Sequence, residues 1–134
     1  MPRVKQINHV AVVVQDMDKA LSFWRDALGI ELHEVRDVPA EKSKVAFLPL
    51  HDSEVELVQP TTDDSGVAKY LAKRGPGMHH ICLEVDDIEG MMSLLKSKGV
   101  RLINENPRVA SDGKRYAFIH PESASGVLVE LYQL

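Results

Sequence analysis

Two stretches of the chain, residues 7–24 and 79–96, share one pattern of apolar and polar positions. Near its start each has a mainly apolar run, "VAVVV" in the first and "ICLEV" in the second, which is typical of a buried strand. A shift of 71 positions places His9 on His80. Beyond the strand, apolar residues recur at the i, i+3, i+4, i+7 spacing of one helix face. The pattern therefore predicts a strand followed by an amphipathic helix, twice in one chain.

Both predicted helices carry start and stop signals. Asp16 and Asp87 are at the N-cap positions, where a short carboxylate accepts hydrogen bonds from the first free amides. Gly29 and Gly99 follow the last apolar positions and predict the ends of the helices. Gly29 and Gly99 are 70 residues apart, whereas Asp16 and Asp87 are 71 residues apart. The segment from the N-cap to the terminating glycine is therefore one residue longer in the first helix, and we expect that helix to be one residue longer.

Each half continues with three short apolar runs that predict strands. They are residues 30–35, 44–50 and 54–60 in the first half and 100–105, 115–121 and 126–133 in the second. The joint, 61–76, contains a helix-like piece at 66–74 before a Gly-Pro-Gly breaker. The prediction is an α+β fold of two βαβββ modules, about 5–60 and 77–134. About 60 residues are marginal alone, so we expect a single domain.

Composition and charge narrow the range of possible functions. The chain has 134 residues, 44% of them hydrophobic, and a formal net charge of −4 without a basic cluster, which gives no support for nucleic-acid binding. It contains neither an apolar run of the ~18 residues that a membrane span needs nor a signal-peptide core. The single cysteine, Cys82, excludes an intramolecular disulfide and is interpreted as a small core residue. We expect a cytoplasmic protein without a membrane partner.

Four polar residues interrupt apolar strands at matched positions of the two halves. They are His9, His80, Glu56 and Glu130. Taken singly, a histidine at a strand start is more often structural, and a strand glutamate more often faces solvent. As two matched pairs they predict a divalent metal site, because a carboxylate among valines and leucines needs a partner. The other candidates are weaker: His33, His51, His120 and Glu84.

The adjacent histidines His79 and His80 cannot have the same role. Neighbouring side chains on a strand point to opposite faces. The repeat aligns His80 with His9, and it aligns His79 with Asn8. We therefore expect His80 to face the metal and His79 to have a packing or capping role.

Several motifs resemble a known family. "INHVAVVV", "VAFLPL" followed by "SEVELVQP", "GVAKYLAKRGPGMHHICLEVDDI" and "GKRYAFIHPESASGVLVEL" are similar to sequences of the vicinal oxygen chelate superfamily, also called glyoxalase-like, and within it to the methylmalonyl-CoA epimerases. The resemblance covers nearly the whole chain. It implies a curved mixed sheet around a metal held by His9, Glu56, His80 and Glu130. Co²⁺ is the favoured ion, with Mn²⁺, Ni²⁺, Zn²⁺, Mg²⁺ and Fe²⁺ as alternatives.

The resemblance also implies a reaction. It is epimerisation of (2R)- and (2S)-methylmalonyl-CoA through an enolate-like intermediate, as a step of propionate metabolism in a cytoplasmic homodimer. Inversion needs a base on each face of the planar intermediate, and Glu130 and Glu56 are the candidates. The family's further glutamate aligns at or near Lys44, while Glu41 lies three residues earlier, so the second base stays open. Candidates for holding the coenzyme A phosphates are Lys73, Arg74, Lys114 and Arg115.

Three alternatives remain at this point. A glyoxalase I acting on a glutathione hemithioacetal would use the same ligand types. An Fe(II) dioxygenase needs only two histidines and one carboxylate, so a fourth protein ligand disfavours it. A non-enzymatic binding module of the same fold needs no metal.

Overall fold

The computed structural model describes all 134 residues and divides into two compact units. One unit is residues 10–79, and the other joins residues 1–9 to residues 80–134. Strands β1 (Val4–Val13) and β5 (Gly77–Val85) each contain a boundary between the units.

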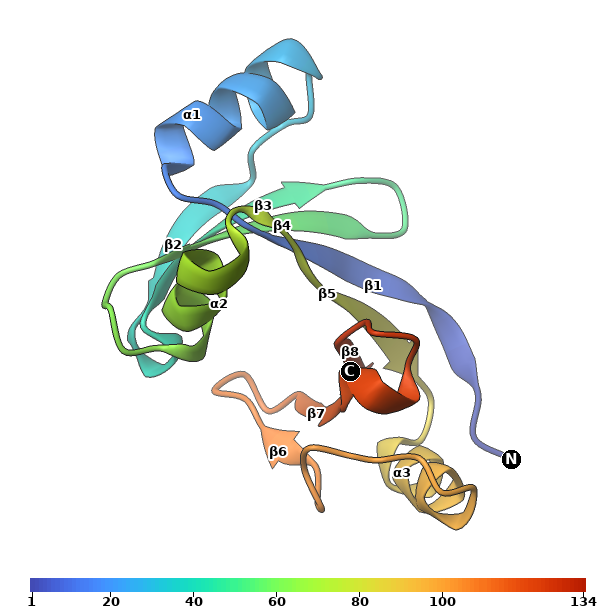
Figure 1. Cartoon of the computed structure of the whole chain (residues 1–134). Coiled ribbons are helices and arrows are strands. Elements are labelled where there is room, and N and C mark those ends of the chain that lie inside the picture. The colour runs from blue at the N-terminus through green and yellow to red at the C-terminus, as the bar shows by residue number, and fades with distance from the viewer. The chain divides into compact units, whose positions relative to one another are not determined.

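The unit of residues 10–79 has the strand order β2-β3-β4-β1 (Figure 1). Its further elements are α1 (Met17–Leu21), the π-helix η1 (Ser22–Ala27), β2 (Glu34–Val38), the 3₁₀ turn η2 (Pro39–Glu41), β3 (Ser43–Pro49), β4 (Glu54–Pro60) and α2 (Gly66–Arg74). Strand β4 runs parallel to β1 and antiparallel to β3, so the sheet is mixed. Glu56 pairs with Ala11 on one side and with Phe47 on the other.

Helix α1 covers one face of this sheet. Met17 and Leu21 of α1 pack with Ala46, Leu48 and Leu57, all of them buried. Paired residues of neighbouring strands share a face, and consecutive residues of one strand point to opposite faces. Glu56 therefore lies on the face opposite α1.

The second unit repeats this plan with the order β5-β8-β7-β6 (Figure 1). Its further elements are α3 (Ile88–Ser97), β6 (Arg108–Val109), β7 (Arg115–Ile119), η3 (Pro121–Ser123) and β8 (Val129–Gln133). Its core consists of Ile88, Met91 and Met92 of α3 packed against the sheet. Glu130 pairs with Cys82 of β5 and Phe118 of β7, on the face opposite α3.

The strand registers confirm the internal repeat. Glu56 pairs with Ala11, and Glu130 pairs with Cys82, which is the repeat equivalent of Ala11. A further match was not predicted: the Oε1 atom of Gln59 accepts the Met17 amide at 2.8 Å, and Oε1 of Gln133 accepts the Ile88 amide at 2.7 Å. Each module thus fixes the start of its helix by a glutamine three residues after the matched glutamate.

The helix signals are also confirmed. Asp16 accepts a hydrogen bond from the Lys19 amide at 3.2 Å, and Asp87 accepts one from the Gly90 amide at 3.0 Å. Gly29 and Gly99 both have φ of +79°, the left-handed conformation that ends helices. The expected extra residue of the first helix is present as the π-helix η1, because a π turn accommodates one added residue.

Two predicted strands were placed wrongly. The strand predicted at 30–35 is found at Glu34–Val38, and Ile30 and Leu32 pack against the α1 core instead. The strand predicted at 100–105 is reduced to one bridge between Leu102 and Ile119. None of the helices has both the length and the apolar character to cross a membrane.

Candidate metal centre

Three of the four predicted metal ligands meet within one unit. Strand β1 supplies His9, β5 supplies His80 and β8 supplies Glu130. The Nε2 atoms of the two histidines are 3.2 Å apart. Oε1 of Glu130 lies 3.4 Å from Nε2 of His9 and 3.1 Å from Nε2 of His80. The three donor atoms form a nearly equilateral triangle.

This triangle fits a first-row divalent metal. Metal–ligand bonds of about 2.0–2.2 Å place neighbouring donors roughly 2.8–3.6 Å apart in tetrahedral or octahedral coordination. The three observed separations, 3.1, 3.2 and 3.4 Å, all fall in that range. Two imidazoles and one carboxylate suit Co, Mn, Fe, Ni and Zn. The donor set and its spacing are therefore those of one face of a coordination sphere.

The surroundings of Glu130 keep it ionised. Burial by itself raises the pKa of its carboxyl, but hydrogen bonds from His80 and then His9 outweigh burial and lower the pKa to about 2. The side chain is only 11% exposed. An anionic carboxylate held in a buried place by two imidazoles is prepared to bind a cation.

The sequence did not predict two close neighbours of the triangle. Cys82 is fully buried, and its sulfur lies with the donor atoms of His9 and Glu130 in a group no wider than 4.8 Å. The ring of Phe118 packs edge-on against His80, with centroids 5.7 Å apart. The signal for both was their place on the same sheet face as Glu130, which only the strand register reveals.

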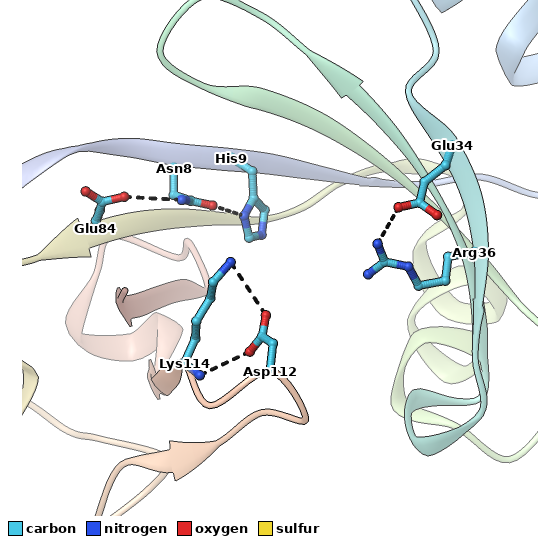
Figure 2. Close-up of polar contacts among 7 residues, drawn as sticks. All are labelled: Asn8, His9, Glu34, Arg36, Glu84, Asp112 and Lys114. Atoms are coloured by element: carbon cyan, nitrogen blue, oxygen red, sulfur yellow. Dashed lines mark hydrogen bonds and ion pairs between the residues drawn. The ribbon is translucent and has the colours of Figure 1, made fainter.

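A chain of polar side chains lies behind His9 (Figure 2). Nδ1 of His9 lies 2.8 Å from Oδ1 of Asn8, and Nδ2 of Asn8 donates to Oε1 of Glu84 at 3.4 Å. Glu84 is 4% exposed, and its other oxygen lies 3.6 Å from Nζ of Lys5. Glu84, which the sequence made only a weak candidate, therefore contacts His9 indirectly, through Asn8.

Residues of the other unit were predicted to complete the site. Glu56 is half-buried and lies on the sheet face opposite α1, in the register that Glu130 has in its own unit. Lys44 pairs with Gln59, three residues beyond Glu56, and therefore lies on the α1 face, away from the face of Glu56. Glu41 is exposed in the turn η2. The role of Glu56 as a ligand stays a prediction.

The two adjacent histidines have different surroundings. The ring of His79 packs edge-on against Tyr70, with centroids 4.9 Å apart, whereas His80 belongs to the triangle. The remaining histidines lie at surface or turn positions. His33 and His51 are exposed beside Glu34 and Asp52, and Nδ1 of His120 accepts the Glu122 amide at the start of η3.

The basic candidates for phosphate binding lie at the surface. Lys73 and Arg74 are exposed in the last turn of α2, and the Arg74 guanidinium lies over the ring of Tyr70. Lys114 pairs with Asp112 at 3.5 Å, and Arg115 pairs with Glu89 at 3.2 Å.

Comparison with known proteins places this fold and site in a family. Residues 8–118 match the model described as the Glyoxalase/Bleomycin resistance protein/Dioxygenase superfamily. The chain is 40% identical over 132 residues to a mitochondrial methylmalonyl-CoA epimerase of Mus musculus, covering 98% of this chain and 74% of the relative. It is 36% identical over 133 residues to an ethylmalonyl-CoA/methylmalonyl-CoA epimerase of Cereibacter sphaeroides, covering 98% and 99%.

A solved structure agrees with these relatives. A methylmalonyl-CoA epimerase in complex with methylmalonyl-CoA and NH4⁺ superimposes with a TM-score of 0.89 at 33% identity, covering 98% of this chain and 95% of that one. The chain belongs to the Glyoxalase/Bleomycin resistance protein/Dioxygenase superfamily. The predicted fold class and the predicted resemblance to methylmalonyl-CoA epimerases, which are isomerases, are confirmed.

Proposed function

We propose that the chain is a metal-dependent epimerase of (2R)- and (2S)-methylmalonyl-CoA, with His9, His80, Glu130 and Glu56 as metal ligands. The observation that carries the metal site is the triangle of donor atoms on His9, His80 and Glu130. The substrate is supported by the names of the relatives and by the methylmalonyl-CoA bound in the similar structure.

Glu56 is included because of the repeat. Each of the two glutamates pairs with the residue two places after its module's predicted histidine ligand: Ala11 for Glu56 and Cys82 for Glu130. If the site follows the repeat, both modules supply one histidine and one glutamate. A divalent ion at such a site would act as a Lewis acid on the thioester oxygen and stabilise negative charge there.

The proposed proton transfer uses two carboxylates. The C2 proton lies between a thioester and a carboxylate, and inversion requires removal from one face and return to the other. Glu130 and Glu56 are the proposed bases. Two hydrogen-bonding imidazoles hold the pKa of Glu130 at about 2, so the carboxylate is ionised and its proton affinity is low.

Deuterium exchange at C2 tests both the reaction and the bases. Protein loaded with Co²⁺ is incubated with each epimer of methylmalonyl-CoA in D2O, and loss of the C2 proton signal is compared with an enzyme-free sample. We expect both epimers to exchange and interconvert. If neither exchanges faster than the enzyme-free sample, the proposed reaction is wrong.

Single substitutions then separate the bases. Glu130→Gln and Glu56→Gln should each lower the inversion rate by about 10²–10⁴-fold. Each variant should still exchange the proton of one epimer without inverting it, because one base remains. Glu41→Gln examines the other candidate for the second base, and Glu122→Gln, an exposed carboxylate paired with Arg101, is the matched control. Metal content is measured first, so that a lost ligand is not mistaken for a lost base.

The alternative reactions are tested on the same preparation. Turnover of a glutathione hemithioacetal would favour a glyoxalase, and oxygen uptake with a catechol would favour a dioxygenase. Co²⁺ as the preferred metal, a cytoplasmic homodimer and a role in propionate metabolism remain parts of the proposal. Metal analysis of the purified protein and its mass in solution test the first two.

A further inference from the structure

We propose that Asn8 and Glu84 are positioning residues that fix the ring tautomer of His9, so that its Nε2 is presented without a hydrogen to the metal. This inference rests on the proposed metal site, but the tautomer itself can be measured without any metal. Neither residue touches the triangle of donor atoms by itself. Both act through His9.

The direction of the hydrogen bonds starts at Glu84. An ionised carboxylate only accepts hydrogen bonds. The Nδ2 amide of Asn8 therefore faces Oε1 of Glu84, at 3.4 Å. This turns the Asn8 carbonyl, Oδ1, towards Nδ1 of His9, 2.8 Å away (Figure 2). A carbonyl oxygen cannot donate, so Nδ1 must carry the hydrogen. The hydrogen bonds that lower the pKa of Glu130 come from charged imidazolium rings, which carry a hydrogen on both nitrogens. In a neutral ring, Nε2 is the bare nitrogen.

The bare nitrogen is the one that the site needs. Nε2 of His9 is the atom that lies 3.4 Å from Oε1 of Glu130 and 3.2 Å from Nε2 of His80. A partner on the far nitrogen of a metal-binding histidine fixes its tautomer and its ring orientation, and loss of that partner weakens metal binding by about 10- to 100-fold. Asn8 contacts this far nitrogen, Nδ1 of His9, and Glu84 in turn contacts Asn8.

Burial of Glu84 supports a dedicated role. It is 4% exposed, and burying a carboxylate is costly unless it is paired. Lys5 lies 3.6 Å from its second oxygen and, with Asn8, provides that pairing. The repeat equivalent of Glu84 is Val13, a fully buried apolar residue, so the fold does not require a carboxylate at this place in a module.

Asn8 and Glu84 lie beside His9, and residues of different chemistry, His79 and Val13, occupy the equivalent positions of the repeat. The repeat equivalent of Asn8 is His79, whose ring packs edge-on against that of Tyr70. The two modules therefore differ at the residue before the ligand. We expect substitutions of Asn8 or Glu84 to affect the tautomer of His9 more than that of His80.

The tautomer is read by ¹⁵N NMR of the metal-free protein, well above the ordinary histidine pKa of about 6.5. His120 is an internal reference of the opposite kind, because its Nδ1 accepts the Glu122 amide at 3.0 Å. We expect His9 to carry its hydrogen on Nδ1 in the unaltered chain. In Glu84→Gln the new amide can either donate or accept, so Asn8 loses its fixed direction and His9 should become a mixture of tautomers. Asn8→Ala should have the same effect.

Metal affinity provides the second measurement. Competition with a chelator for Co²⁺ or Zn²⁺ should show about 10- to 100-fold weaker binding in Glu84→Gln and Asn8→Ala. Glu89→Gln, an exposed carboxylate 3.2 Å from Arg115, is the matched control and should bind as the unaltered chain does.

The outcomes are separable. The inference is wrong if His9 of the unaltered chain carries its hydrogen on Nε2, or if both variants keep the original tautomer and affinity. Glu84→Gln is nearly isosteric and removes a buried charge, so it remains informative if Asn8→Ala fails to fold. A chain that binds neither Co²⁺ nor Zn²⁺ overturns the metal proposal, while the NMR result still decides the tautomer.

Discussion

Neighbouring residues on one strand can have unrelated roles, as His79 and His80 of β5 show. His79 contacts the Tyr70 ring, and His80 lies 3.1 Å from the Glu130 carboxylate. Their difference follows from the alternation of side chains along a strand. The repeat identified which of the two would belong to the site, because only His80 aligns with another histidine.

Substitution of each histidine by alanine tests this assignment. His80→Ala removes a proposed ligand atom. Loss of a residue that only hydrogen-bonds to a ligand weakens metal binding by about 10- to 100-fold, and we expect a larger loss of Co²⁺ affinity in His80→Ala. His79→Ala removes a packing contact and should leave Co²⁺ affinity nearly unchanged. Isothermal titration of both variants, with circular dichroism to verify folding, measures the difference. Equal losses in the two variants would contradict the assignment.

At this scale the sequence predicted the three residues whose donor atoms meet better than it predicted the residues around them. His9, His80 and Glu130 stood out because they interrupt apolar runs at matched positions. Asn8, Cys82 and Glu84 carried no such signal. An asparagine beside a histidine is ordinary, and a buried cysteine reads as core. Their roles depend on pairing between strands far apart in sequence, which a single sequence does not display.

The helices are the elements that the sequence determined most fully. Local signals suffice for them: a capping aspartate, an apolar stripe and a terminating glycine. The extra residue of the first helix was also predicted, because Gly29 and Gly99 are closer together in sequence than Asp16 and Asp87. The structure accommodates it in the π-helix η1.

Removing one cap tests how much the local signal contributes. Asp87→Ala deletes the acceptor of the Gly90 amide at the start of α3 and should lower the free energy of unfolding by about 1 kcal/mol. Asp87→Asn should restore most of it, because asparagine caps equally well. Urea denaturation of both variants provides the measurement. No loss in the alanine variant would mean that Gln133, which accepts the Ile88 amide, suffices to fix the helix start.

Strand positions were less predictable than helices. Residues 101–104 do run beside β7, with the Ile103 amide donating to the Phe118 carbonyl at 2.8 Å. The next bond is taken by a side chain, since Oδ1 of Asn104 accepts the Phe118 amide at 2.8 Å. Side-chain acceptors of this kind compete with a backbone ladder. Val100 and Leu102 pack against the α3 core, but Ile103 is exposed and Asn104 is buried, so the apolar positions predicted neither the burial nor the backbone pairing of this segment.

Asp64, in the segment between β4 and α2, makes the stability of the folded chain depend on pH. Hydrogen bonds from Thr62 and Lys42 lower the pKa of Asp64 to about 2. An unfolded aspartate has a pKa of about 3.9, so these contacts stabilise the folded chain above that pH. The stabilisation is lost as the pH falls from about 3.9 through about 2. Thr62→Ala should raise the pKa of Asp64, as carboxyl-carbon NMR titration can measure. An unchanged pKa would show that the Thr62 hydroxyl does not lower the pKa of Asp64.

At the scale of the whole molecule, the repeat was the most informative feature of the sequence. It predicted two βαβββ modules and three residues, His9, His80 and Glu130, whose donor atoms meet in the fold. What it did not predict lies where the modules differ. Position 84 is a glutamate in one and its equivalent, Val13, is apolar in the other, so symmetry gave no indication of the contacts that link Glu84 through Asn8 to His9.

Metal binding should stabilise the folded chain, because His9, His80 and Glu130 come from three strands separated by more than 40 residues in sequence. The unfolded chain does not bring them together, so binding to the folded state alone adds about 2.7 kcal/mol at an ion concentration of 100 times Kd. For a chain of this size, we expect Co²⁺ to raise the melting temperature by roughly 5–15 °C. EDTA should reverse the shift, His79→Ala should retain it, and His80→Ala should lose most of it. An equal shift in His80→Ala, measured by calorimetry, would place the ion elsewhere on the molecule.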